Sequence, residues 1–101
     1  MIRRIVKMVF REDEVSQFHQ VFEERKDLIR SQPGCHGVQL LQDHHDPRIH
    51  FTFSLWESED DLNKYRNSDL FGETWKLTKS LFAEKAQAWS LLLKSEPGNS
   101  K

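Results

Sequence analysis

Three side chains of the sequence could transfer a proton or hold a substrate hydroxyl group: His19, His50 and Tyr65. His19 stands beside the apolar stripe of a predicted helix, where it could act as a general base. His50 stands on the polar face of a predicted central strand, and we expect it to point toward the lumen of a dimer. Tyr65 could hold or deprotonate a hydroxyl, although its ordinary pKa of about 10 makes it a weak base unless that pKa is shifted. The alternative for both histidines is a structural role. His19 would then lie on the flank of its helix without a chemical function, and His50 would be hydrogen-bonded in an interface.

Four large aromatic side chains fall at the end of that strand and at helical spacing after it. They are Trp56, Tyr65, Phe71 and Trp75. Such rings could form the wall of a cavity that stacks on a planar ligand and excludes water. Ordinary core packing is the alternative, because each buried ring stabilises a fold by about 1.5–3 kcal/mol. We predict that these four rings bind a small aromatic organic ligand.

Two other pairs of residues have types that occur at metal or nucleophile sites. His44 and His45 are neighbours in a predicted turn, and Cys35 precedes His36. Adjacent side chains in an extended turn point apart, and the sequence has no histidine pair at i, i+4 spacing, so we predict no metal site. Cys35 has no third residue that would orient it as a nucleophile, and we expect a structural thiol.

The alternation of apolar residues predicts four strands, which cover residues 2–10, 37–42, 49–56 and 85–93. In the first strand, Arg4 interrupts an otherwise apolar face. The order of the predicted elements is β-α-β-β-α-β, with the second helix split. It predicts an α+β fold, a ferredoxin-like sandwich with one four-stranded antiparallel sheet over residues 1–94 and a polar tail over residues 95–101.

Helical spacing and capping residues define the segments between the strands. Apolar residues three and four apart favour a helix over about residues 14–32. Ser58 followed by Asp61 fits a capping box, which begins a short helix, and residues 67–69 separate that helix from the next. The composition of residues 83–94 leaves a helix as the alternative to the last strand, since Ala, Glu, Lys and Gln favour helices.

The predicted sandwich leaves one face of its sheet without helices. The last strand places Trp89, Leu91 and Leu93 on that face. An uncovered apolar face of this kind indicates a protein partner. The simplest partner is a second copy of the chain, stacked sheet against sheet in a homodimer.

Composition excludes several classes of function. The 101 residues include 15 basic and 16 acidic side chains, and no long run of one sign indicates nucleic acid or a membrane surface as a partner. A single cysteine excludes a disulfide within the chain. The first ten residues are too few and too charged for a signal peptide, and no apolar run reaches the roughly 20 residues of a membrane span. We therefore expect a soluble cytoplasmic protein.

Several short motifs are similar to one known family. The matching stretches are Leu55-Trp56 at the end of the third strand, the turn 57–60, the spaced Leu62 and Tyr65, the segment 67–71 and the turn 33–38. With these motifs the sequence resembles the antibiotic-biosynthesis monooxygenase family of dimeric α+β barrels, over residues 2–93. The resemblance implies a homodimer in which each protomer has a pocket between its sheet and its helices.

The resemblance also implies candidate reactions. Members of the family include oxygenases that need no cofactor and act on quinols or polyphenols, and oxygenases that degrade haem. The histidine that binds iron in the haem-degrading branch would fall at Trp75 or one turn away, and no histidine follows His50. We therefore expect no cofactor and disfavour haem degradation. The asparagine that the family often has in the first strand is also absent, since residues 6–8 are Val, Lys and Met.

Two functions follow as hypotheses. The first is cofactor-independent oxidation of a small planar quinol-like or polyphenolic compound. The second is a dimer that binds a small molecule, or acts in a stress response, without catalysis, and it is motivated by the missing asparagine and histidine. An isomerase or lyase on the same fold is a third alternative, which predicts conversion of substrate without uptake of oxygen.

Overall fold

A computed structural model describes residues 1–98 of the chain. Its elements in order are β1 (Ile2–Phe10), a short 3₁₀ helix η1 (Glu12–Glu14), α1 (Val15–Arg30), β2 (Cys35–Gln42), β3 (Ile49–Trp56), α2 (Glu59–Arg66), α3 (Asp69–Lys79) and β4 (Phe82–Leu91). The order confirms the predicted β-α-β-β-α-β arrangement with a split second helix. The last segment is a strand, so the helical alternative for residues 83–94 is wrong.

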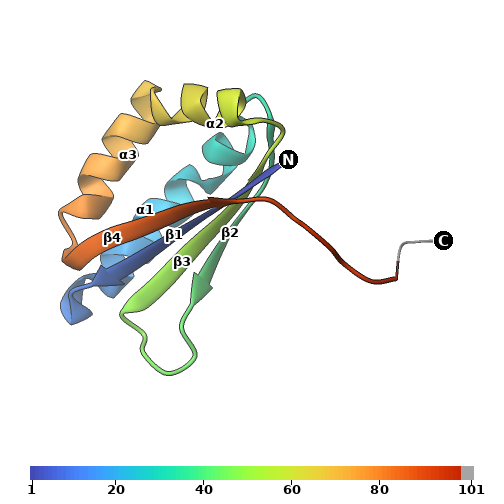
Figure 1. The fold of residues 1–101 in the computed structure, drawn as a ribbon. Coiled ribbons are helices and arrows are strands. Elements are labelled where there is room, and N and C mark those ends of the chain that lie inside the picture. The colour runs from blue at the N-terminus through green and yellow to red at the C-terminus, as the bar shows by residue number, and fades with distance from the viewer. Residues whose placement is uncertain (99–101) are drawn as a thin grey trace.

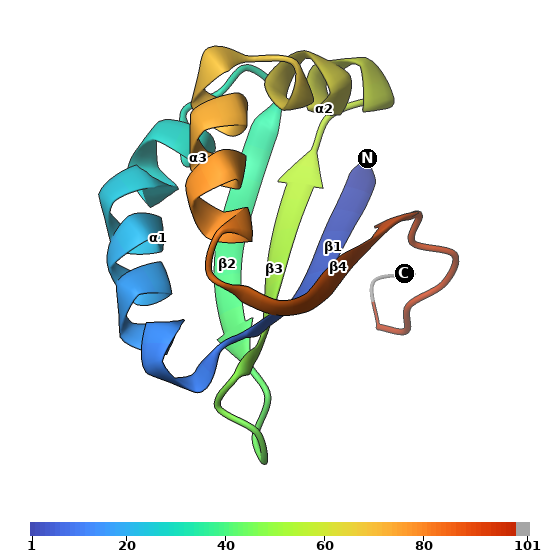
Figure 2. The ribbon, with the colours of Figure 1, turned by 90° about the vertical axis from the view of Figure 1, so that its left-hand side faces the viewer.

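The strands form one antiparallel sheet in the order β2-β3-β1-β4, and the helices lie on one of its faces (Figure 1). Figure 2 shows α1 and α3 next to each other over that face, with α2 across one end of the sheet. Residues 92–98 form no helix or strand and lead away from the sheet. Residues 99–101, the end of the predicted tail, lie outside the described residues.

Serine residues cap the N-termini of α2 and α3. The Ser58 Oγ accepts a hydrogen bond of 3.1 Å from the backbone N–H of Asp61 at the start of α2. At the start of α3, the Ser68 Oγ accepts one of 3.2 Å from Phe71 N–H. Each cap satisfies an N–H group that the helix itself leaves unpaired. The helix start predicted at Ser58 is thus confirmed, and the second cap explains why the helical region is split.

The register of the sheet shows which side chains face the helices. Met8 pairs with His50, and both belong to the face that the helices cover. By alternation the polar residues of β3, including Thr52 and Ser54, share that face. The apolar set of β3, including Phe51 and Phe53, faces the other way. The expectation that His50 points to the lumen of a dimer is therefore wrong.

Two apolar clusters hold the helices on the sheet. The larger one consists of buried Met8, Phe10, Phe18, Phe22 and Leu81, which join β1 to α1 and to the start of β4. The smaller one consists of Cys35, Trp56 and Leu62 and fixes α2 against the ends of β2 and β3. Burial of such side chains is the main stabilising contribution to the fold.

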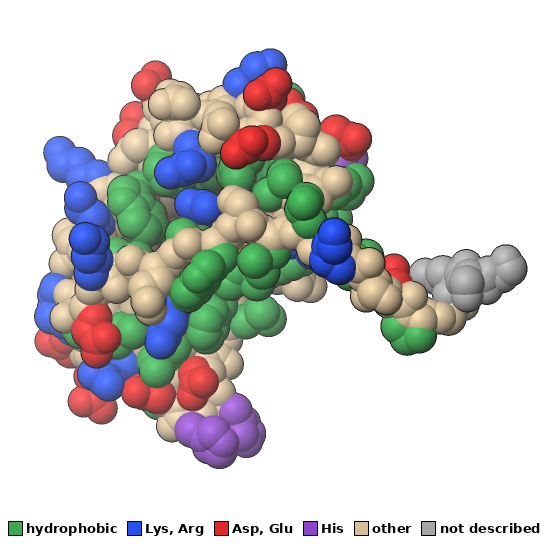
Figure 3. All heavy atoms as spheres, in the orientation of Figure 1, with side chains coloured by type: hydrophobic (Ala, Val, Ile, Leu, Met, Phe, Trp, Pro, Cys, Tyr) green, Lys and Arg blue, Asp and Glu red, His purple; other side chains and the backbone are tan. Residues whose placement is uncertain are grey.

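The opposite face of the sheet is uncovered in the protomer. Leu41, Trp89 and Leu91 on this face are 50%, 43% and 45% exposed. Figure 3 shows hydrophobic side chains gathered in a band along the strands. Because β4 ends at Leu91, Leu93 follows the strand and is not part of the sheet, contrary to the prediction. We call this surface, which also includes Phe51 and Phe53, the open sheet face.

No helix in residues 1–98 has both the length and the apolar character that a membrane crossing needs.

Candidate functional site

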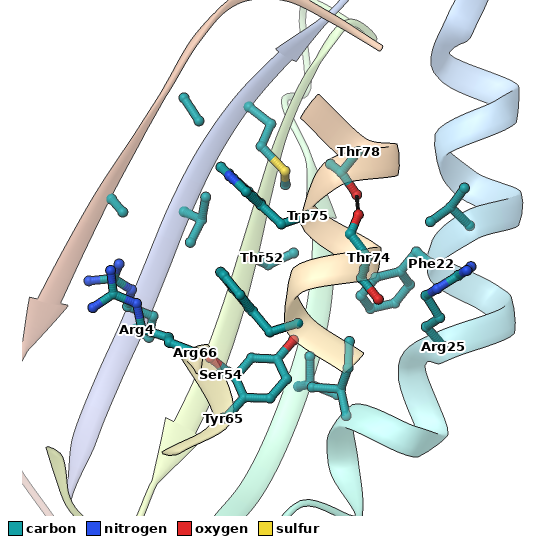
Figure 4. A pocket seen from close by; sticks show the side chains of 18 of the residues that line it. Arg4, Phe22, Arg25, Thr52, Ser54, Tyr65, Arg66, Thr74, Trp75 and Thr78 are labelled. Atoms are coloured by element: carbon teal, nitrogen blue, oxygen red, sulfur yellow. Dashed lines mark hydrogen bonds between the residues drawn. The ribbon is translucent and has the colours of Figure 1, made fainter. Parts of the chain in front are cut away.

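A cavity of about 360 Å³ lies between the covered face of the sheet and the three α-helices (Figure 4). α3 packs against α1 and α2 above the sheet. Beneath it the strands present several short side chains, among them Thr52 and Ser54 on β3 and Ala86 and Ala88 on β4, together with longer ones from β1 such as Arg4 and Met8. The short side chains leave space under α3, and members of both core clusters, including Met8 and Leu62, complete the lining.

Three of the four predicted aromatic residues form one wall of this cavity. Tyr65 from α2 and Phe71 and Trp75 from α3 line it. The rings of Phe71 and Trp75 are stacked, with centroids 5.9 Å apart and planes at 9°, and Tyr65 meets Phe71 edge-on at 5.3 Å. Such an array offers flat apolar faces to a planar molecule.

Trp56, the fourth predicted ring, does not reach the cavity. It is 0% exposed, and its indole N–H donates a hydrogen bond of 2.9 Å to Ser54 Oγ. Its ring stacks on the back of Tyr65, with centroids 5.0 Å apart. The expectation that Trp56 contacts a ligand is therefore corrected, because the indole belongs to the smaller core cluster and holds Tyr65 in position.

The environment of Tyr65 favours its protonated form. Burial first, and then the neighbouring Cys35 thiol, raise the pKa of Tyr65 to about 12. The phenol is consequently protonated at neutral pH. No group in residues 1–98 forms a hydrogen bond with its hydroxyl, so it can donate one to an oxygen atom of a ligand. The raised pKa disfavours the predicted role as a base, and the role of holding a substrate stays a prediction.

The two histidines predicted to act as bases lie together, outside the cavity. The Nε2 atoms of His19 and His50 are 2.8 Å apart, so one ring donates a hydrogen bond to the other. His50 is fully buried, edge-on to Phe10 and Phe18. Burial, and then the charge of His19, lower the pKa of His50. Neither ring lines the cavity, and no motif or spacing in the sequence indicates that they pair.

The charged side chains that line the cavity are all arginines: Arg4, Arg25 and Arg66. None of them was among the predicted site residues. One sign was present, because Arg4 interrupts the apolar face of the central strand β1. The lining also contains Thr74, whose Oγ1 is buried without a hydrogen-bond partner in the described part of the chain.

The lining does not fit a histidine-bound haem or a metal ion. Trp75 occupies the position where the resemblance places an iron ligand, and none of the lining residues is a histidine. Within residues 1–98, no three His, Cys, Asp or Glu side chains are grouped as metal ligands. His44 and His45 remain in the turn between β2 and β3, and the Cys35 thiol is buried in the smaller core cluster.

Fold and cavity together define a ferredoxin-like α+β domain with a ligand-sized space between its sheet and its helices. The sequence model of the antibiotic biosynthesis monooxygenase family matches residues 1–77, which is most of the chain. The protein therefore belongs to the antibiotic biosynthesis monooxygenase family.

Solved structures show the same fold. A conserved protein from Methanosarcina mazei Go1 superposes with a TM-score of 0.88 at 20% identity, over 92% of each chain. An antibiotic biosynthesis monooxygenase superposes with 0.88 at 15% identity, over 94% of this chain and all 100% of the other. A candidate antibiotic biosynthesis monooxygenase from Bordetella bronchiseptica gives 0.83 at 25% identity, over 93% and 97%. A comparison with curated proteins gives no match.

Proposed function

We propose that the protein is a cofactor-independent monooxygenase that oxidises a small planar quinol-like or polyphenolic compound. The observation that supports this proposal is the cavity of about 360 Å³ with its wall of Tyr65, Phe71 and Trp75. Its size is within the range of small-molecule sites, and it is covered by helices on one side and by the sheet on the other. An electron-rich ring stacked on this wall would be shielded from water while it reacts with oxygen.

The proposed reaction needs no external reductant. A phenol with a free ring C–H reacts with O₂ to give a quinone and water, so the substrate supplies four electrons. One oxygen atom forms the new carbonyl group, and the other leaves as water. The reactive species is the phenolate, which is favoured by positive charge and by hydrogen-bond donors near its oxygen. The arginines of the lining and the Tyr65 hydroxyl have these properties, and the phenol proton would pass to solvent.

We further propose that the functional unit is a homodimer formed through the open sheet face. That face carries exposed Leu41, Trp89 and Leu91, whose contact with water is unfavourable. A second copy would cover it and leave both cavities on the outer, helical side of the assembly.

Oxygen uptake with a panel of hydroquinones and polyphenols tests the proposed reaction. We expect one O₂ consumed per product, and mass spectrometry after reaction under ¹⁸O₂ should show one labelled atom in the product. Trp75→Ala should lower kcat/KM at least tenfold, since it removes a stacking face worth about 1.4 kcal/mol or more.

The matched control is Leu77→Ala, which changes an exposed side chain of the same helix that does not line the cavity. This variant should keep the activity of the wild type. Absence of uptake with every compound, or a product without ¹⁸O, would contradict the proposal.

A non-catalytic binding protein is the second candidate, and one observation favours it. The cavity is lined by no Asp, Glu, His or Lys, and the phenol of Tyr65 is held protonated. A protein of this class would bind the planar compounds, detected by calorimetry, and leave them unchanged in air. Turnover of any compound in the panel would exclude it.

A further inference from the structure

The mouth of the cavity carries two positive charges close together. Arg4 extends from the central strand β1, and Arg66 from the last residue of α2. Both line the cavity, and Figure 4 shows their side chains at the same end of it. The pKa of Arg4 is lowered, first by burial and then by the charge of Arg66. Arg4 is half-buried and Arg66 is exposed. Holding two guanidinium groups near each other is unfavourable in the absence of an anion, because like charges repel.

No carboxylate neutralises this pair in residues 1–98. Arg48 forms an ion pair with Asp46 at 3.1 Å, and Arg25 contacts Glu24 at 3.5 Å. Arg4 and Arg66 have no such partner among the described residues, and no acidic side chain lines the cavity. Arg4 is instead oriented by Ser90 on the neighbouring strand, whose Oγ accepts a hydrogen bond of 3.0 Å from its Nη1. The remaining N–H groups of the guanidinium are available to a ligand.

We propose that Arg4 and Arg66 bind the carboxylate group of an aromatic acid whose ring lies against the aromatic wall. The proposal rests on the proposed function for the position of the ring, and it specifies the substrate class as an anionic one. A carboxylate would accept paired hydrogen bonds from the planar guanidinium groups and relieve the repulsion between them. The ring would then extend inward toward the Tyr65 hydroxyl, which can donate a hydrogen bond to one of its oxygen substituents.

Calorimetry with 2-naphthoate and 2-naphthamide tests this assignment. The two probes have the same ring, differ in charge and are not phenols, so binding is measured without turnover. We expect wild-type protein to bind the carboxylate at least tenfold more tightly than the amide. Higher salt should reduce that preference, because the pair lies at the mouth of the cavity.

Arg4→Gln and Arg66→Gln should each weaken binding of 2-naphthoate about tenfold, by removal of a charge-assisted hydrogen bond, and leave the amide unchanged. The unchanged amide affinity shows that each variant is folded. Lys64→Gln is the matched control, since it removes an exposed charge of the same helix outside the cavity lining. It should bind both probes as the wild type does.

The outcomes separate this inference from the proposed function. Equal affinity for both probes, or variants that retain the preference for the carboxylate, would overturn the arginine site and leave ligand binding in the cavity intact. Failure of both probes to bind would overturn the arginine site and the cavity assignment together. Tight, arginine-dependent binding of 2-naphthoate without oxygen uptake on any phenol would support the arginine site and refute only the oxygenase.

Discussion

At the scale of single residues, polar groups in this protein are divided between two places. The imidazole of His50 is enclosed by Phe10 and Phe18 in the core, and the half-buried His19 is hydrogen-bonded to it. The arginines and the Tyr65 hydroxyl face the cavity, where a ligand can reach them. We therefore expect the histidine pair to affect the stability of the fold, and the arginines and Tyr65 to affect ligand binding.

The histidine pair should make stability depend on pH. The pKa of folded His50 is below its ordinary value of 6.5, so the unfolded chain binds the proton more tightly. The free energy of unfolding should be level above about pH 6.5 and fall at lower pH, with a slope of at most about 1.4 kcal/mol per pH unit from this group. Urea unfolding between pH 5.5 and 7.5 measures the effect.

Two variants isolate the contribution of the pair. His19→Gln removes the neighbouring positive charge and should flatten the profile in part, while His45→Gln, in an exposed turn, should leave it unchanged. A wild-type profile that is level down to pH 5.5 would show that His50 titrates normally.

At the scale of elements, the turn between α1 and β2 depends on one glycine. Gly34 has φ of 82°, in the left-handed region, and its carbonyl accepts a hydrogen bond of 2.7 Å from Glu57 N–H. A Cβ at this position would also collide with the side chain of Asp61. The turn thereby links the first helix to the N-terminus of α2.

Gly34→Ala should therefore lower the free energy of unfolding by roughly 1–3 kcal/mol, from backbone strain and from displacement of Asp61. Gly72→Ala is the contrasting substitution, because Gly72 lies inside α3 with open space around its Cα. It should stabilise the protein by about 0.5–1 kcal/mol. Thermal and chemical denaturation measure both, and equal effects of the two substitutions would refute the role of the turn.

Periodicity predicted the elements and their order, since strands and amphipathic helices alternate clearly in this chain. Periodicity did not predict which face of β3 lies against the helices, because an apolar face is ordinarily assigned to the core. Here the apolar face, including Phe51 and Phe53, is the open sheet face, and the polar face with Thr52 and Ser54 lines the cavity. The last strand also begins earlier than the predicted residue 85, because Phe82 pairs with Phe10 in the sheet.

The candidate site was predictable in part. Tyr65, Phe71 and Trp75 could be found from helical spacing, because that spacing places them on one side of consecutive helices. The approach of Arg66 to Arg4 joins residues far apart in the sequence, and only the packing of α2 over the end of the sheet brings them together. Contacts of that kind leave no periodic pattern.

At the scale of the whole molecule, a small domain has an apolar face on either side of its sheet. One is covered by its own helices, and the open sheet face is left for the proposed second copy. Trp89→Lys and Leu91→Lys should each shift the protein toward monomer by placing an unpaired charge in the interface. Sedimentation velocity over a range of concentrations measures the shift.

Leu28→Lys is the control for this experiment, because Leu28 is 54% exposed on α1, away from the open sheet face. It should leave the sedimentation coefficient unchanged. A wild-type protein that sediments as a monomer at all concentrations would refute the homodimer.

The three tryptophans of the chain occupy three distinct environments. Trp56 is enclosed in the core, Trp75 faces the cavity, and Trp89 lies on the open sheet face. Indole fluorescence responds to the polarity around each ring, so proteins that retain one tryptophan at a time, with phenylalanine at the other two positions, become separate optical reporters. The first would follow unfolding, the second occupancy of the cavity, and the third association of protomers, all without an added label.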